Sequence, residues 1–97
     1  MILVRNIFQA NFGKAGELAK IMKGTTEQMG KMFGGKVRVL TDLSGQYDTV
    51  VMEVEVESLG MWEQKRAEMF ASPELGEQTV GIEGMIIGGR AEFFTIE

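Results

Sequence analysis

The sequence predicts an α+β fold in which the elements follow the order strand, helix, strand, strand, helix, strand. Residues 50–57 alternate Val50, Met52, Val54 and Val56 with a second, glutamate-rich set, which is typical of a half-buried strand. Residues 14–33 repeat apolar side chains at spacings of three and four, as in a helix with one buried face. A connection of only three residues, 44–46, joins two of the strands, so these must be antiparallel neighbours.

Length and composition exclude several classes of protein. The 97 residues predict one domain, residues 1–97, and the hydrophobic fraction of 44% is ordinary for a soluble globular protein. A net charge of −4 without a basic stripe argues against a nucleic-acid partner. No apolar run approaches the roughly 20 residues of a membrane span, and Arg5 and Asn6 interrupt the apolar start before a secretory segment could form. We therefore expect a cytoplasmic protein without a membrane partner.

The chain contains neither histidine nor cysteine. The usual ligands of zinc, copper and haem iron are therefore missing, as are the Ser-His and Cys-His nucleophile systems and the commonest general base. We expect no metal site and no resident cofactor. Chemistry in this chain has to use carboxylates, Lys, Arg, Tyr, Trp, amides or an imported cofactor.

The first two elements occupy the amino-terminal third of the chain. Residues 2–10 carry apolar side chains on both faces, as expected of a central strand, and Asn6 lies in the middle of the more apolar face, where its amide needs partners. The helix over residues 14–33 contains Gly24 and Gly30, each costing about 1 kcal/mol relative to alanine. Gly34-Gly35 is expected to end it, with one glycine in the left-handed conformation.

The remaining elements are two further strands and two further helices. Residues 36–43 form the second predicted strand, and Ser58 is a plausible cap for a helix over residues 59–71. Ser72-Pro73 begins a further short helix, with Leu75 and Val80 as its expected buried side. Residues 85–96 form the last strand, in which Gly88-Gly89 suggests a bulge or the close approach of another backbone.

Right-handed crossovers in both halves place the two main helices on one face of a four-stranded antiparallel sheet, which is the ferredoxin-like βαββαβ arrangement. We call the opposite side of the sheet the uncovered face. It combines aliphatic side chains with charges of both signs, a mixture that suits a partner sheet with Arg–Glu pairs across it; a half-solvated sheet with cross-strand ion pairs is the alternative. The predicted interface residues are Arg5, Ile7, Arg38, Leu40, Val51, Glu53, Glu55, Arg90 and Glu92.

Several short motifs resemble the dimeric α/β-barrel superfamily, with similarity to NIPSNAP-like and antibiotic-biosynthesis-monooxygenase-like proteins. They are Gly13-Lys14, Trp62-Glu63, Ser72-Pro73-Glu74 and the ending G-G-R-A-E-F-F at residues 88–94, and their order extends over nearly the whole chain. The resemblance implies a homodimer whose sheets pack face to face, with a ligand pocket between sheet and helices. Members of the superfamily perform cofactor-free monooxygenation, lactone isomerisation or haem chemistry, and some have no known activity, so the fold alone implies no reaction.

Candidate ligand-binding residues are expected around a pocket between sheet and helices, and the face that Phe94 occupies depends on the bulge at Gly88-Gly89. These candidates are Asn6, Phe8, Trp62, Met69 and Phe94. Asn6, Trp62 and Tyr47 also supply the residue types that position substrate and dioxygen in the resembling cofactor-free monooxygenases, which makes them candidate catalytic residues. The simpler interpretations are that Trp62 is core packing and that Tyr47 caps the sheet from a turn.

Glu53 and Glu55 share a face at a separation of roughly 6.5–7 Å along the strand. Two carboxylates so placed could perform acid–base chemistry or hold a hard cation. Nearby arginines would repel a metal, however, and pairing of the glutamates with these arginines is the favoured interpretation.

The sequence therefore predicts a homodimeric barrel protein of uncharacterised activity that binds a small apolar or aromatic molecule between sheet and helices. The first alternative is a cofactor-free monooxygenase or isomerase acting on an aromatic or polyketide-like substrate. The second alternative is a structural or regulatory interaction module.

Overall fold

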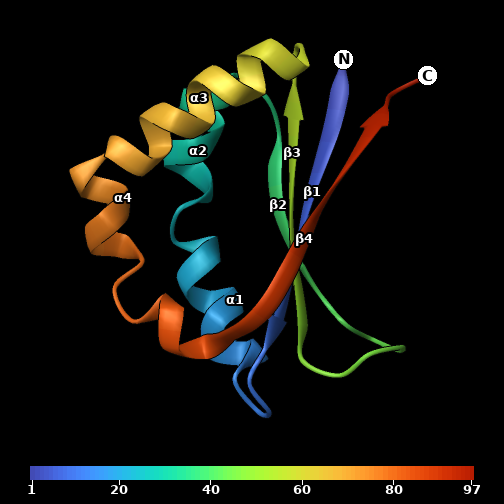
Figure 1. Cartoon of the computed structure of the whole chain (residues 1–97), viewed down its shortest axis with the longest axis vertical. Coiled ribbons are helices and arrows are strands. Elements are labelled where there is room, and N and C mark those ends of the chain that lie inside the picture. Colours follow the sequence, from blue (N-terminus) through green and yellow to red (C-terminus); the bar gives the residue numbers. More distant parts are fainter.

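A computed structural model describes residues 1–97 as a four-stranded antiparallel sheet with all helices on one side (Figure 1). The strand order β2-β3-β1-β4 confirms the predicted ferredoxin-like α+β fold. The elements are β1 (Ile2–Ala10), α1 (Ala15–Lys23), α2 (Thr26–Phe33), β2 (Val37–Thr41), β3 (Thr49–Val56), α3 (Leu59–Ala71), α4 (Pro73–Gln78), the short 3-10 helix η1 (Ile82–Met85) and β4 (Ile86–Thr95).

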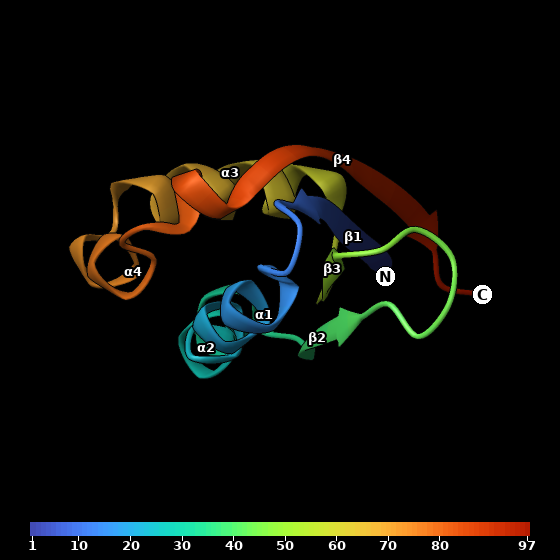
Figure 2. The same cartoon turned by 90° about the horizontal axis from the view of Figure 1, so that it is seen from below.

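The sheet separates two environments. Figure 2 shows α1 to α4 together on one side, while the connection between β2 and β3 reaches out on the other. β1 is central because it pairs with β3 along one edge and with β4 along the other. Val4 stands opposite Val54, and both are fully buried under the helices. Arg5 stands opposite Glu53 on the uncovered face, because successive side chains of a strand point to opposite sides.

The predicted single helix over residues 14–33 is wrong, because the structure has two helices there. Gly24 and Thr25 separate α1 from α2. The hydroxyl of Thr25 donates to the carbonyl of Met22 at 2.7 Å, and the N–H of Gly24 is shared between two carbonyls. A hydroxyl that bonds a carbonyl of the preceding turn, next to a glycine, weakens and bends the helix at this point. The predicted end of this region is confirmed, since Gly34 follows α2 with a φ of 72°.

The predicted caps of the later helices are confirmed. The hydroxyl of Ser58 accepts from the N–H of Met61 at 3.1 Å and starts α3. Ser72 accepts from the N–H of Leu75 at 3.4 Å and starts α4, with a proline in its first turn. Leu75 is buried as expected, but Val80 is 75% exposed because α4 ends before it. None of these helices has the length and apolarity needed to cross a membrane.

β2 and β4 differ in detail from the prediction. β2 covers only Val37–Thr41, because the Asp42 carboxylate accepts from the N–H of Thr49 and begins the connection to β3. In β4 the register shifts between the pairs Gln9–Gly88 and Ala10–Ile86, so the predicted bulge lies one residue before the glycine pair. The predicted close approach is at Gly89, where a Cβ would lie 3.0 Å from a backbone oxygen of β1.

Candidate functional site

A mostly apolar hollow lies between the sheet and its helices, as predicted. It has a volume of about 390 Å³, within the range of small-molecule sites. β1 and β3 form its floor, and α1 to α4 with η1 form its walls. We call it the helix-side pocket; its lining residues are Asn6, Phe8, Met22, Thr25, Met29, Met52, Trp62, Arg66, Met69, Phe70, Leu75, Gly76, Thr79, Ile82 and Ile86.

Trp62 belongs both to the core and to the pocket wall. Its ring stacks on Phe33 at a centroid distance of 5.3 Å and meets Phe93 edge-on at 6.3 Å. Only 8% of the residue is exposed. The packing interpretation of Trp62 therefore holds, and the same side chain lines the helix-side pocket.

The polar groups of the pocket differ in how far they are satisfied. The hydroxyls of Thr25 and Thr79 donate to backbone carbonyls of their own helical turns, each at 2.7 Å. The amide of Asn6, half-buried on the sheet floor opposite Met52, has no hydrogen-bond partner in the chain. An amide in this position can both donate to and accept from a bound molecule.

Four of the five predicted ligand-binding residues line this pocket: Asn6, Phe8, Trp62 and Met69. Phe94 does not, and that prediction is corrected. The bulge at residue 87 sets the register of β4 so that Phe94 stands opposite Leu3 on the uncovered face. Phe93, one residue earlier, is the aromatic residue that contacts Trp62.

The predicted catalytic trio is not assembled in one place. Asn6 and Trp62 share the helix-side pocket, whereas Tyr47 lies in the connection between β2 and β3 and is 79% exposed. Tyr47 borders a separate shallow depression with Phe12 and Asp48. The structure therefore does not bring Tyr47 to the pocket that the other two candidates share.

Much of the pocket wall consists of methionine side chains. Met22, Met29 and Met52 are buried and line the cavity beside Met69, and the flexible methionine side chain can adapt its shape to an apolar ligand. Arg66 lies in the same helical row as Trp62 and Met69, and this spacing was the available signal that it would border the pocket.

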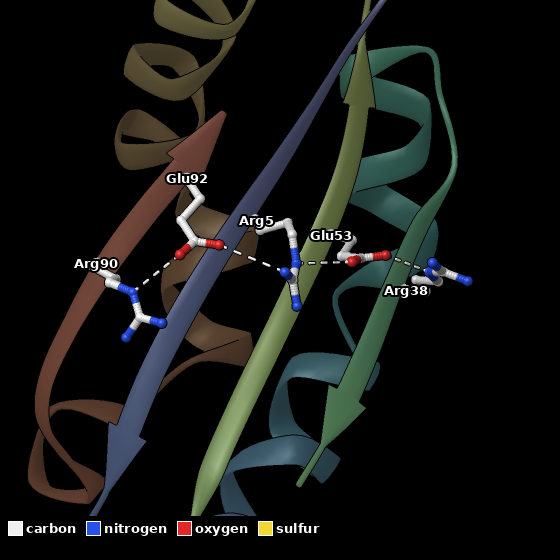
Figure 3. Close-up of polar contacts among 5 residues, drawn as sticks. All are labelled: Arg5, Arg38, Glu53, Arg90 and Glu92. Carbon is white, nitrogen blue, oxygen red and sulfur yellow. Dashed lines mark hydrogen bonds and ion pairs between the residues drawn. The ribbon is translucent and has the colours of Figure 1, made fainter. Parts of the chain in front are cut away.

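A row of charged side chains crosses all four strands on the uncovered face (Figure 3). Glu53 lies between two guanidinium groups, with Arg5 Nε at 3.0 Å and Arg38 Nε at 2.5 Å. Glu92 extends the row, with Arg5 Nη1 at 3.5 Å and Arg90 Nε at 3.3 Å. The buried Nε–H of Arg5 lies outside hydrogen-bond geometry, so its contact with Glu53 is an ion pair only. Glu53 is only 6% exposed, which makes it the centre of the network.

All nine predicted interface residues lie on the uncovered face by register. The pairing of Glu53 with arginines is confirmed, but Glu55 has no arginine partner because Leu3 stands opposite it. No group of three or more acidic residues is arranged to hold a metal ion. A second hollow of about 580 Å³ lies on this face, between the sheet and the connection from β2 to β3. The function of the uncovered face as a dimer interface stays a prediction.

No protein-family model matches the sequence, and a comparison with curated proteins finds no relative. Solved structures are similar in fold. An uncharacterised NIPSNAP domain protein from Burkholderia xenovorans aligns with a TM-score of 0.82 at 18% identity, covering 100% of this chain and 95% of its own. A NIPSNAP family protein from Agrobacterium tumefaciens aligns with a TM-score of 0.85 at 13% identity, covering 99% and 92%. A candidate antibiotic biosynthesis monooxygenase from Deinococcus radiodurans aligns with a TM-score of 0.73 at 14% identity, covering 100% and 93%.

These comparisons confirm, at the level of the fold, the resemblance to NIPSNAP-like and monooxygenase-like proteins. The identities are too low to transfer a substrate or a reaction, because one fold supports many functions.

Proposed function

We propose that this chain is a homodimeric barrel protein that binds a small apolar or aromatic molecule in the helix-side pocket. The observation that carries the ligand-binding part is the cavity of about 390 Å³ with ten hydrophobic lining residues and the unpaired amide of Asn6 on its floor. A few polar groups within a mostly apolar cavity are characteristic of small-molecule sites.

The exposed surface supports self-association. The chain exposes 6270 Å², whereas a compact monomer of 10.7 kDa is expected to expose about 5,500 Å². The chain therefore exposes more surface than a compact monomer of its size, and part of this surface is available to a second copy. A second copy is the occupant that we favour for the uncovered face, because its arginines and glutamates neutralise one another within the sheet and leave a surface with little net charge to repel a copy of itself.

β4 adds to this argument. It is a ten-residue edge strand in which nearly every residue is exposed, including Phe93 and Phe94 at 46% each. Long apolar edge strands are usually protected, since they otherwise pair with other chains. Burial of β4 and the uncovered face in a dimer provides such protection. Sedimentation equilibrium at micromolar concentration tests whether the chain forms this dimer, and a purely monomeric species contradicts the proposal.

Ligand binding can be measured through Trp62, the only tryptophan. Menadione, a neutral naphthoquinone that quenches tryptophan emission, should quench Trp62 in a saturable manner. At about 100 times its Kd, a ligand raises stability by about 2.7 kcal/mol and raises the Tm accordingly. Naphthol and other neutral aromatic compounds can be screened by the same rise in Tm.

A pocket-filling variant separates specific from collisional quenching. Gly76 lines the pocket, and a Cβ there meets nothing within 4 Å, so Gly76→Phe adds volume at the cavity wall. Gly16→Phe is the matched control, since Gly16 also has free space around it but lies in α1 outside the pocket lining. Quenching and the Tm rise should be lost only in Gly76→Phe. Identical behaviour of both variants, or no response to any aromatic compound, favours an interaction module without a ligand.

A cofactor-free monooxygenase is the second candidate, since Asn6 and Trp62 border the same cavity. In this reaction dioxygen converts a substrate methylene, such as that of an anthrone, into a carbonyl, and the second oxygen atom leaves as water. Oxygen consumption with anthrone should fall in Asn6→Ala and persist in Tyr47→Phe, because Tyr47 lies outside the pocket. Equal rates in wild type, both variants and buffer exclude this activity.

A further inference from the structure

Arg66 differs from the other three arginines of the chain. Arg5, Arg38 and Arg90 each form an ion pair with a glutamate on the uncovered face. Arg66 forms no ion pair with any carboxylate of the chain, although it lies on α3 among glutamates. It borders the helix-side pocket on the opposite side of the sheet.

The exposed side chain of Arg66 lies at the mouth of the pocket, over an aromatic ring that is 73% exposed. Its Cζ lies 5.2 Å from the ring centroid of Phe70, which also lines the pocket. A guanidinium stacked on a ring keeps its edge N–H groups free, and their fork geometry matches a carboxylate. The N–H groups of Arg66 can therefore donate hydrogen bonds to an anionic group at the mouth of the pocket.

The pocket contains no group that would compete for this charge. No aspartate or glutamate is among its fifteen lining residues. The hydroxyls of Thr25 and Thr79 already donate to backbone carbonyls, and ten of the remaining residues are hydrophobic. A positive group at the border of an apolar cavity is complementary to a molecule with an apolar body and one negative end.

We propose that the ligand of the helix-side pocket is an amphipathic carboxylic acid, whose apolar body lies among the methionines and Trp62 and whose carboxylate pairs with Arg66. This inference rests on the proposed ligand-binding function and narrows it to one chemical class. An amine of the same shape would meet the Arg66 charge with its own positive charge and is disfavoured. A neutral alcohol gains the apolar contacts but not the charge-assisted hydrogen bonds.

Three ligands with the same alkyl chain test the charge preference: decanoate, decanol and decylamine. Isothermal titration calorimetry on the full-length protein should give an affinity for decanoate about tenfold higher than for decanol, as expected for a hydrogen bond to a charged group. Decylamine should bind more weakly than decanol. The advantage of decanoate should shrink as salt is raised, while the affinity for decanol should not fall.

Substitutions at position 66 assign the preference to this side chain. Arg66→Gln should lower the affinity for decanoate about tenfold and leave that for decanol unchanged, whereas Arg66→Lys should retain part of the preference. Lys65→Gln is the matched control, because it removes the same charge from the neighbouring position, which does not line the pocket. Its affinities should equal those of wild type.

The outcomes separate this inference from the function on which it rests. Equal binding of decanoate and decanol by wild type, or an equal loss for both ligands in Arg66→Gln, overturns the carboxylate preference and leaves an apolar site. Absence of binding by all three ligands and by menadione overturns the ligand-binding function together with the preference.

Discussion

Asp48 links the connection after β2 to the start of α1, and its replacement provides the sharpest test of how the fold is stabilised. Its carboxylate accepts hydrogen bonds from the N–H of Gly13 at 3.1 Å and of Ala15 at 3.4 Å. Lys14, at the N-cap position of α1, provides no side-chain cap, so a carboxylate from a distant part of the chain takes this role. Asp48 also has a φ of 55°, the only positive value at a non-glycine residue.

Three terms set the expected loss of stability in Asp48→Ala. Removal of a helix cap costs about 1 kcal/mol, and removal of a negative charge from a helix N-terminus costs about 0.3–1 kcal/mol. Alanine also tolerates the left-handed backbone less well than aspartate, which adds up to about 1 kcal/mol. Asp48→Ala should therefore lower the free energy of unfolding by about 2 kcal/mol, equivalent to a Tm lowered by about 10 °C in a domain of this size.

Two further variants separate these terms. Asp48→Gly removes the carboxylate but suits the positive φ, so it should cost about 1 kcal/mol less than the alanine variant. Asp48→Asn retains an acceptor oxygen and loses only the charge, so it should cost less than 1 kcal/mol. Urea unfolding at one fixed protein concentration measures the differences, with Glu83→Ala as an exposed control. If all three variants unfold within about 0.5 kcal/mol of wild type, the capping role of Asp48 is wrong.

Further predictions concern the uncovered face and β4. Glu53→Gln should lower the free energy of unfolding by about 2 kcal/mol in urea titrations, because two partly exposed guanidiniums lose their shared carboxylate; an unchanged midpoint contradicts this. Phe94→Glu should shift the sedimentation equilibrium from dimer to monomer with unchanged far-UV circular dichroism, while the equally drastic Phe12→Glu, in an exposed loop, should not. Gly89→Ala should lower the free energy of unfolding by about 1 kcal/mol because its Cβ would press on a β1 carbonyl, whereas Gly88→Ala should be neutral or stabilising; the reverse order refutes the assigned register.

The sheet was predictable because its alternation is strong. Residues 2–10 are the first strand in both the prediction and the structure, and Val50, Val54 and Val56 are almost completely buried. The division of the first helix was not predicted, because the periodic stripe continues through Thr25 and α2 keeps the same buried side. Only the Thr25 hydroxyl and Gly24 mark the break, and threonine and glycine also occur within uninterrupted helices.

The site was predictable where it depends on one strand or one helix and not where it depends on register between strands. Asn6 and Trp62 follow from the faces of their own elements. The face of Phe94 depended on the register of β4, because a single-residue bulge exchanges the faces of the residues that follow it. The bulge at residue 87 places Phe94 with Arg90 and Glu92 on the uncovered face. The contacts of Asp48 with α1 join positions more than thirty residues apart and leave no local pattern in the sequence.

The two faces of the molecule meet in β1, because adjacent residues of this strand belong to different sites. Arg5 joins the charged row of the uncovered face, and Asn6 forms part of the floor of the helix-side pocket. Both positions depend on the same register with β3, where Arg5 pairs with Glu53 and Asn6 with Met52. A shift by one residue would bring the Arg5 guanidinium among the methionines and the Asn6 amide between Glu53 and Glu92. The first exchange buries a charge without a partner, and the second leaves two glutamates without their shared arginine. The charged row therefore favours the one register of β1 that also forms the pocket.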